Sequence, residues 1–383
     1  MNKSIFIFSG EQSADNHGAL LARAIKKNIP DVKLTGVGGA ELKDAGVDII
    51  RDNSDLSVVG IIEVLKHYNK FRTLLNSTEK YIKDKSIDLV ILIDYPGFNL
   101  RLAKLLKKQS CKVVYYISPQ LWAWGKNRIK IVKQCIDHVI VIFKFEELFY
   151  KEHNVAVSYV GHPLLDNFDA EINTKALRDK INLDSERKTI VFLPGSRKVE
   201  IQRLIPEILN TIKKLSQTSH DFQFVISAAS TMLESEINQA ISAFKWGLKQ
   251  VNVKIYAEDI NPLIKVADFV VVASGTASLQ VAIHQKPMAV IYKINMFSYY
   301  ILKKMITIPY VSIVNIIADK MVVPELIQDK CNHNEISKLV IEYFENDEYK
   351  ERMKKDLVTF KTILGSSGAS DNAAKIIKKL LNE

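Results

Sequence analysis

Short runs of apolar and β-branched residues recur along the chain, separated by longer stretches in which apolar residues return every three or four positions. We predict the short runs as β-strands: Ser4–Ser9, Val32–Val37, Leu89–Ile93, Lys112–Ile117, His138–Ile142, Thr189–Leu193, Phe222–Ser227, Lys254–Ala257, Phe269–Val272 and Met288–Ile291. Few polar residues interrupt these runs, which is typical of parallel strands buried on both faces. Their alternation with helical stretches predicts an α/β fold.

Both halves of the chain open with an apolar strand, a turn containing Gly and Ser, and a long helix, at Ile5–Asp15 and at Ile190–Arg197. This predicts two Rossmann-like domains, residues 1–165 and 166–346, that face each other across a cleft. The segment 347–383 is predicted as helices that return to the first domain, with a Gly-Ser-Ser-Gly break at 365–368. Ligands of open α/β sheets bind at the carboxyl ends of the strands, so functional residues are expected in the loops there.

Composition narrows the class of protein. The chain has 383 residues, 47% hydrophobic and 25% charged, which is typical of a globular protein and excludes a disordered or collagen-like one. No uncharged apolar window is long enough for a transmembrane helix, and the apolar run at the N-terminus is too short for a signal peptide. The three cysteines are far apart, with no zinc or disulfide spacing. We therefore expect a cytoplasmic protein.

The formal net charge of +10 favours a polyanionic partner: nucleic acid, phosphorylated metabolites or an anionic bilayer. No nucleic-acid-binding motif is present, so we expect no nucleic acid partner. Lysines that merely cover a solvated surface remain an alternative. The dinucleotide fingerprint fails because Glu41 stands where the third glycine belongs, and no Walker motif occurs, so dehydrogenases and P-loop NTPases are excluded.

Two loops in the second half are predicted to bind anions. The first holds Gly195, Ser196 and Arg197 between a strand and a helix; glycine allows close backbone approach, and arginine can pair with phosphate through two hydrogen bonds. The second presents the hydroxyls and amides of Ser274, Gly275 and Thr276 at a helix start, where Ser274 could instead cap the helix. Two such loops in one domain indicate a nucleotide diphosphate.

In the first half, Asp94 ends a predicted buried strand and is our candidate general base; a cap for the next helix is the alternative. Glu11 is the rival acid–base candidate. Trp122 and Trp124 would either stack on a sugar or acyl chain or serve packing. There is no Asp-x-Asp and no histidine pair at metal-ligand spacing, so we expect no metal and no other cofactor.

Nine segments in order resemble the lipid-A-disaccharide synthases (glycosyltransferase family 19), the glycosyltransferases of Gram-negative lipid A assembly. They are Ser9–Asp15, Gly36–Gly39, Leu56–Leu65, Ile93–Asn99, Ile117–Trp124, Val160–Leu164, Leu193–Arg197, Ala273–Ala277 and Tyr310–Asn315. The resemblance implies a GT-B fold and an inverting, metal-independent transfer. The implied donor is UDP-2,3-diacylglucosamine, the acceptor is 2,3-diacylglucosamine 1-phosphate, and the products are the β-1′,6-linked disaccharide 1-phosphate and UDP.

The resemblance also implies roles for individual residues. Asp94 would be the base for the acceptor 6-hydroxyl, Arg197 would handle phosphate, and Glu11 would lie in the active site. Further implied substrate-binding residues are Ser13, Asp15, Gln280, Asn315 and Glu325.

The chain departs from the family pattern at Ala14, Gln280 and Lys293, where glycine, glutamate and arginine are usual. These departures leave two alternatives open: another UDP-sugar enzyme of the same fold, such as a 2-epimerase, and a non-catalytic UDP-sugar-binding paralogue.

A lipid acceptor implies peripheral attachment to the cytosolic face of the inner membrane. The segments Leu56–Leu75 and Phe297–Met305 combine apolar residues with lysines and are the candidates for membrane contact. Amphipathic helices that cover an ordinary core are the alternative. The sequence leaves the oligomeric state open, a homodimer included.

Overall fold

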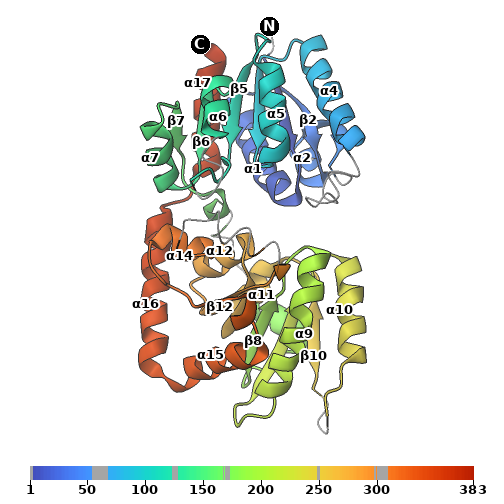
Figure 1. Ribbon diagram of the computed structural model, residues 1–383, viewed down its shortest axis with the longest axis vertical. Coiled ribbons are helices and arrows are strands. Elements are labelled where there is room, and N and C mark those ends of the chain that lie inside the picture. The colour runs from blue at the N-terminus through green and yellow to red at the C-terminus, as the bar shows by residue number, and fades with distance from the viewer. Residues whose placement is uncertain are drawn as a thin grey trace. The chain divides into compact units, whose positions relative to one another are not determined.

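The computed structural model describes residues 3–53, 68–122, 128–166, 168, 173–247, 251–296, 299 and 309–383. The chain forms two compact units, each around its own sheet (Figure 1). Unit 1 comprises Met1–Asn167 and Gly365–Glu383, and unit 2 comprises Phe168–Leu364. The segments 54–67, 123–127, 297–298 and 300–308 lie outside the described residues, and with them most of both candidate membrane segments and Trp124.

The sheet of unit 1 has, in its described part, seven parallel strands in the order β3-β2-β1-β4-β5-β6-β7. These strands are β1 (Ser4–Ser9), β2 (Lys33–Gly38), β3 (Asp48–Asp52), β4 (Leu89–Ile93), β5 (Lys112–Tyr116), β6 (His138–Val141) and β7 (Val157–Tyr159). The helices of this unit are α1 (Gln12–Asn28), α2 (Ala40–Asp44), α4 (Tyr68–Asp84), α5 (Pro96–Leu106), α6 (Ile129–Cys135), α7 (Lys144–Glu152) and α17 (Ala369–Asn382), with a 3₁₀ turn at Pro163–Leu165. The first six strands follow the Rossmann order.

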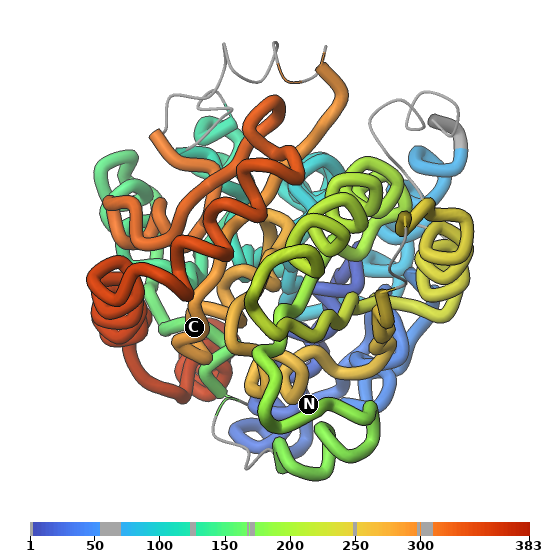
Figure 2. Tube along the Cα trace, turned by 90° about the horizontal axis from the view of Figure 1, so that it is seen from below, coloured from blue at the N-terminus to red at the C-terminus, as the bar shows by residue number. Residues whose placement is uncertain are grey.

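Unit 2 repeats that order with six parallel strands in its described part, β10-β9-β8-β11-β12-β13. They are β8 (Lys188–Leu193), β9 (Phe222–Ser227), β10 (Val253–Tyr256), β11 (Phe269–Ala273), β12 (Met288–Tyr292) and β13 (Glu325–Ile327). The helices are α8 (Thr174–Lys180), α9 (Lys198–Leu215), α10 (Thr231–Ala243), α11 (Ile260–Val266), α12 (Thr276–Ile283), α14 (Ile313–Ala318), α15 (His333–Glu345) and α16 (Asp347–Leu364), with a 3₁₀ turn at Gln328–Lys330. Helices α9 and α10 lie side by side on this sheet (Figures 1 and 2).

The central strands form the core of each unit. Every residue of β4 is fully buried, as are Ile5–Phe8 of β1 and Phe269–Val272 of β11. This burial explains the continuous apolar runs in the sequence, because helices cover both faces of such a sheet. The α/β prediction with two Rossmann-like domains is confirmed, and each of the ten predicted strands is present with its ends shifted by one residue or less.

The C-terminal helices divide between the units. Helix α16 packs on α12, α14 and α15 of unit 2, whereas α17 packs on α1 of unit 1. The segment that joins unit 1 is therefore Gly365–Glu383, and Asp347–Leu364 stays in unit 2. The Asp166 carboxylate secures the start of α17 by accepting hydrogen bonds from the amides of Gly368 (2.7 Å), Ala369 (3.0 Å) and Ser370 (2.8 Å). In the described part of the chain, no helix is both long and apolar enough to cross a membrane.

Candidate active site

In unit 1 the strand order reverses between β1 and β4, and two acidic candidates lie there. Glu11 follows β1 as the N-cap residue of α1, and Asp94 follows β4 directly. The Tyr95 ring packs over Gly10, where an added Cβ would lie 2.6 Å from ring atom Cδ1. Burial, and then the charge of Glu11, raise the pKa of Tyr95. Glu11, Asp94 and Tyr95 thus gather at the topological switch point, where open α/β sheets bind ligands.

The backbone that carries Asp94 is strained. Asp94 and Tyr95 have φ of 46° and 45°, and Ile117 after the neighbouring β5 has φ of 56°. Each such residue costs about 1–3 kcal/mol, and these conformations concentrate at functional sites. Tyr115 Oη (2.5 Å) and Asn99 Nδ2 (2.6 Å) donate hydrogen bonds to the Asp94 carbonyl and hold this turn. The N-cap position of α5 is Tyr95, not Asp94.

Asp15 contacts backbone in its own unit. It is fully buried, and its carboxylate accepts hydrogen bonds from the amides of Gly39 (2.6 Å) and Glu41 (3.0 Å). An added Cβ at Gly39 would lie 2.8 Å from Asp15 Oδ2, which explains the glycine after β2. The neighbouring Ala14 is 2% exposed, so its methyl group faces the interior, and Ser13 is half-buried. Asp15 therefore fixes the loop between β2 and α2.

In unit 2 the two predicted anion loops also meet at the switch point. Gly195–Arg197 follow β8, Ser274–Thr276 follow β11, and β8 pairs with β11. Each loop leads into a helix, α9 and α12 respectively. Backbone amides and helix N-termini at this edge suit a diphosphate.

A carboxylate lies over the first of these loops. Glu200 Oε2 accepts hydrogen bonds from the amides of Ser196 (3.2 Å) and Arg197 (3.4 Å), and Glu200 Oε1 lies 3.6 Å from Arg197 Nη1. Gly195 has φ of 107°, and an added Cβ would lie 2.2 Å from Glu200 Oε2. Burial and the Glu200 charge raise the pKa of Tyr292, the last residue of β12, which places it beside the same loop.

The second loop connects to a buried amide network. Ser274 Oγ donates to the Val311 carbonyl (3.3 Å), and the N-cap position of α12 is Gly275, which has no capping side chain. Gly275 and Thr276 are exposed, and Gln280 is half-buried on the same helix.

Asn315 and Glu325 hold the backbone around Val311, whose carbonyl accepts the hydrogen bond from Ser274. Asn315 is fully buried and makes four hydrogen bonds: to the Val323 carbonyl and Glu325 Oε1, both 2.8 Å, and from the amides of Val322 and Val323. Glu325 accepts from the amides of Val311 and Ser312, both at 2.9 Å. All the hydrogen-bonding capacity of the Asn315 amide is thereby used. Asn315 and Glu325 act on the loop beside Ser274 through its backbone.

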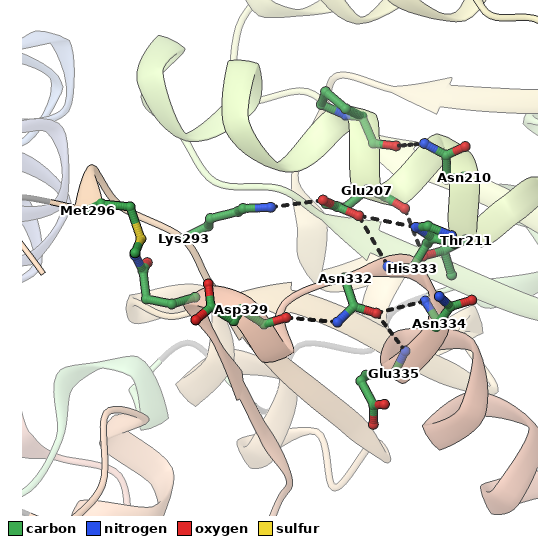
Figure 3. A network of polar contacts seen from close by, with 12 residues as sticks. Glu207, Asn210, Thr211, Lys293, Met296, Asp329, Asn332, His333, Asn334 and Glu335 are labelled. Atoms are coloured by element: carbon green, nitrogen blue, oxygen red, sulfur yellow. Dashed lines mark hydrogen bonds and ion pairs between the residues drawn. The ribbon is translucent and has the colours of Figure 1, made fainter.

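Lys293 pairs with Glu207 of α9 (Figure 3). The Nζ–Oε1 distance is 2.8 Å, and Glu207 Oε2 also accepts from the His333 amide at 3.1 Å. Burial raises the pKa of Glu207, but the hydrogen bonds from Lys293 and His333 outweigh it, so the net shift is downward. A lysine can make this contact with one charged group, without the two-pronged geometry of arginine.

Three residues at these edges were not among the predicted site residues: Tyr95, Glu200 and Tyr292. Glu200 carries no capping-box signal in the sequence, because that pattern requires Ser, Thr, Asp or Asn at the helix N-cap and the residue there is Arg197. Tyr95 and Tyr292 depend on neighbours distant in sequence. Across the described ranges, no cluster of three His, Cys, Asp or Glu side chains could hold a metal ion.

The fold class follows from comparison with solved structures. The putative UDP-N-acetylglucosamine 2-epimerase from Listeria monocytogenes matches with a TM-score of 0.67 at 11% identity, covering 100% of this chain and 97% of that one. The UDP-GlcNAc 2-epimerase from Neisseria meningitidis bound to UDP-GlcNAc matches with a TM-score of 0.66 at 14% identity, covering all of both chains. These likenesses show the GT-B fold.

The family follows from sequence comparison. The family model described as lipid-A-disaccharide synthetase matches residues 5–377. The lipid-A-disaccharide synthase of Coxiella burnetii (strain CbuG_Q212) is 34% identical over 380 residues, 99% of each chain. Lipid-A-disaccharide synthase 1 of Legionella pneumophila (strain Lens) is 38% identical, covering 95% of this chain and 94% of that one. The chain belongs to the lipid-A-disaccharide synthase family, which confirms the resemblance and makes it a glycosyltransferase of lipid A assembly.

Proposed function

We propose that this enzyme joins UDP-2,3-diacylglucosamine to 2,3-diacylglucosamine 1-phosphate, giving the β-1′,6-linked disaccharide 1-phosphate and UDP. The observation that carries the proposal is the placement of the candidate residues. Glu11 and Asp94 flank the switch point of unit 1, and the loops Gly195–Arg197 and Ser274–Thr276 flank that of unit 2. Unit 1 thus offers an acidic edge for one substrate, and unit 2 offers an anion-binding edge for the other.

Unit 2 takes the donor. The diphosphate of the UDP-sugar binds the amides of the Gly195–Arg197 loop and the exposed start of α12 at Gly275 and Thr276. Arg197 neutralises the charge that develops on the departing UDP. Gln280, on the first turns of α12, is close enough in sequence to these amides to contact the nucleoside.

Unit 1 takes the acceptor. Asp94 removes the proton of the acceptor 6-hydroxyl as that oxygen attacks the anomeric carbon of the donor, and the bond from this carbon to the diphosphate breaks. Attack from the face opposite the leaving group inverts the configuration, so an α-linked donor gives a β-linked product. Glu11, on the neighbouring strand end, and Ser13 bind the acceptor. Asp15, Asn315 and Glu325 act as positioning residues through the backbones they hold.

We further propose that the enzyme is peripheral to the cytosolic face of the inner membrane, since its acceptor is a lipid. The net charge of +10 and the exposed Lys70 and Arg72 on α4 support attraction to anionic headgroups. Sedimentation with anionic and with neutral vesicles tests this part: binding to the anionic vesicles alone, weakened by salt, is expected, and equal binding to both would contradict it.

The reaction is tested by incubating purified protein in mild detergent with both substrates and analysing the product by mass spectrometry. A tetraacyl disaccharide 1-phosphate is expected, formed equally well with EDTA present. The 2-epimerase alternative predicts instead a UDP-sugar of unchanged mass, and the non-catalytic alternative predicts UDP binding without product.

A further inference from the structure

One buried carboxyl group at the active edge of unit 1 has no role in the proposed reaction. Glu146, in the first turn of α7, is 2% exposed. Its Oε1 accepts hydrogen bonds from Ser118 Oγ (3.2 Å) and Trp122 Nε1 (3.3 Å). Its Oε2 is buried and has no hydrogen-bond partner in the described part of the chain. Leaving a buried polar atom unpaired costs about 1–3 kcal/mol, so the arrangement calls for a reason.

The two donors come from the turn that follows β5, the strand next to β4. Tyr116 ends β5, and its carbonyl accepts a hydrogen bond from the Asp94 amide at 3.2 Å. Two residues later comes Ser118, after Ile117 with its left-handed backbone. The turn held by Glu146 therefore begins beside the backbone of the proposed base.

A second contact from α7 supports the same turn. Tyr150 Oη donates to the Pro119 carbonyl at 3.2 Å, and Tyr150 is fully buried. The Trp122 ring meets Phe145 edge-on, with ring centroids 4.9 Å apart and planes at 90°. Helix α7 thus holds both ends of the turn, and Trp122 is the half-buried side chain whose orientation the Glu146 hydrogen bond fixes.

We propose that Glu146 is a positioning residue for the acceptor half of the site: through Ser118 and Trp122 it fixes the Ser118–Trp122 turn beside Asp94, and it does so as a neutral carboxylic acid. This inference rests on the proposed function, because it assigns that turn to acceptor binding. The protonated form keeps both hydrogen bonds that Oε1 accepts and avoids a net charge at a fully buried position. This burial outweighs the backbone amides of Phe143 and Ile142, which favour the charged form.

The titration of Glu146 is consistent with this role. Burial raises its pKa to about 7, against the hydrogen bonds from Trp122 and Ser118 that lower it. Tyr150, whose pKa responds to the charge of Glu146, does not titrate near that pH, because burial raises the pKa of Tyr150 well above its ordinary value. Loss of the proton from Glu146 is then the event near neutrality that loosens the turn.

The test compares Glu146→Gln, Glu146→Ala and, as a control for charge in the same turn of α7, Glu147→Gln. In the wild type and the control, kcat/KM for the acceptor is expected to fall several-fold above pH 7. Glu146→Gln keeps a neutral acceptor oxygen and is expected to remove that fall, whereas Glu146→Ala is expected to lower kcat/KM at least tenfold at every pH. The Kd for UDP is expected to stay unchanged throughout.

A spectroscopic readout separates this inference from the proposed reaction. With Trp124 and Trp246 replaced by Phe, Trp122 is the sole tryptophan of the chain. Its fluorescence is expected to change with a midpoint near pH 7, and not to do so when Glu146 is also replaced by Gln. The proposal is overturned if the fluorescence of the variant with Trp122 as its sole tryptophan does not change near pH 7. It is also overturned if kcat/KM of Glu146→Gln falls above pH 7 as much as that of the wild type. If the wild type transfers no sugar, the proposed function fails, while the fluorescence still decides whether Glu146 controls Trp122.

Discussion

The carboxylate of Glu200 lies 3.2 Å from the amide nitrogen of Ser196, within the loop that we assign to the donor diphosphate. It also lies near the Arg197 guanidinium, at 3.6 Å. The loop thus holds an anion supplied by its own helix. A bound diphosphate would need the same amides and the same guanidinium, so Glu200 must compete with it.

Replacing Glu200 by Gln is therefore expected to strengthen UDP binding by roughly threefold, in line with about 0.3–1 kcal/mol for a charge at a helix N-terminus. The amide oxygen of glutamine can still accept the hydrogen bonds from the Ser196 and Arg197 amides, so the helix start is kept. Isothermal titration calorimetry measures the change. Glu186→Gln, an exposed charge change near the other end of β8, is the control and is expected to leave the Kd unchanged. Weaker binding in Glu200→Gln would show that the carboxylate supports the loop without competing.

The attachment of α17 to unit 1 gives a stability prediction. Asp166 accepts hydrogen bonds from three successive amides at the start of that helix. Asp166→Ala removes these acceptors from a partly buried helix start and is expected to lower the free energy of unfolding of unit 1 by about 2 kcal/mol. Hydrogen exchange of the α17 amides, together with urea denaturation, measures it. Lys375→Ala, which removes the exposed lysine of an i,i+4 pair on the same helix and leaves the Asp371 carboxylate in place, should cost less than about 0.5 kcal/mol; equal losses in the two variants would argue against the capping role.

Glu146 makes the stability of unit 1 depend on pH. Its pKa is raised from 4.5 to about 7 in the folded chain. Between these two pH values the folded chain retains a proton that the unfolded chain has lost, so stability falls as the pH rises through this window. The wild type should lose on the order of 3 kcal/mol relative to Glu146→Gln between pH 4 and pH 8. The buried His17 and His162 occur in both proteins, so their contributions cancel. Parallel plots of unfolding free energy against pH would refute the shift.

The sequence predicted the interior of both sheets and missed strands at their edges. The ten predicted strands include all the fully buried ones, whose apolar runs are continuous. The three that were missed, β3, β7 and β13, are edge strands. Strand β3 is mostly exposed, and β7 and β13 have three residues each, so none carries a continuous buried run.

The sequence predicted which loops form the candidate site. It predicted less well which partners the individual side chains contact. Asp94, Glu11 and both anion loops follow strands that the apolar pattern identifies, so their place at the sheet edge follows from the fold. Asp15 and Asn315 illustrate the limit. Their partners, Gly39 and Glu325, depend on how the chain folds back, and the sequence motif does not tell a residue that binds substrate from one that holds a loop.

The most direct test of the account is the initial rate of tetraacyl disaccharide formation by the wild type and by Asp94→Asn, followed by mass spectrometry alongside UDP affinity. Asparagine tolerates the left-handed backbone at this position but cannot accept the proton. Asp84→Asn, an exposed change at the end of α4, is the matched control. We expect product from the wild type and the control, a rate at least 100-fold lower in Asp94→Asn, in line with the usual contribution of a general base, and the same Kd for UDP in all three. Equal rates in Asp94→Asn and the wild type would contradict the assignment of the base, and UDP binding without product in the wild type would contradict the proposed reaction itself.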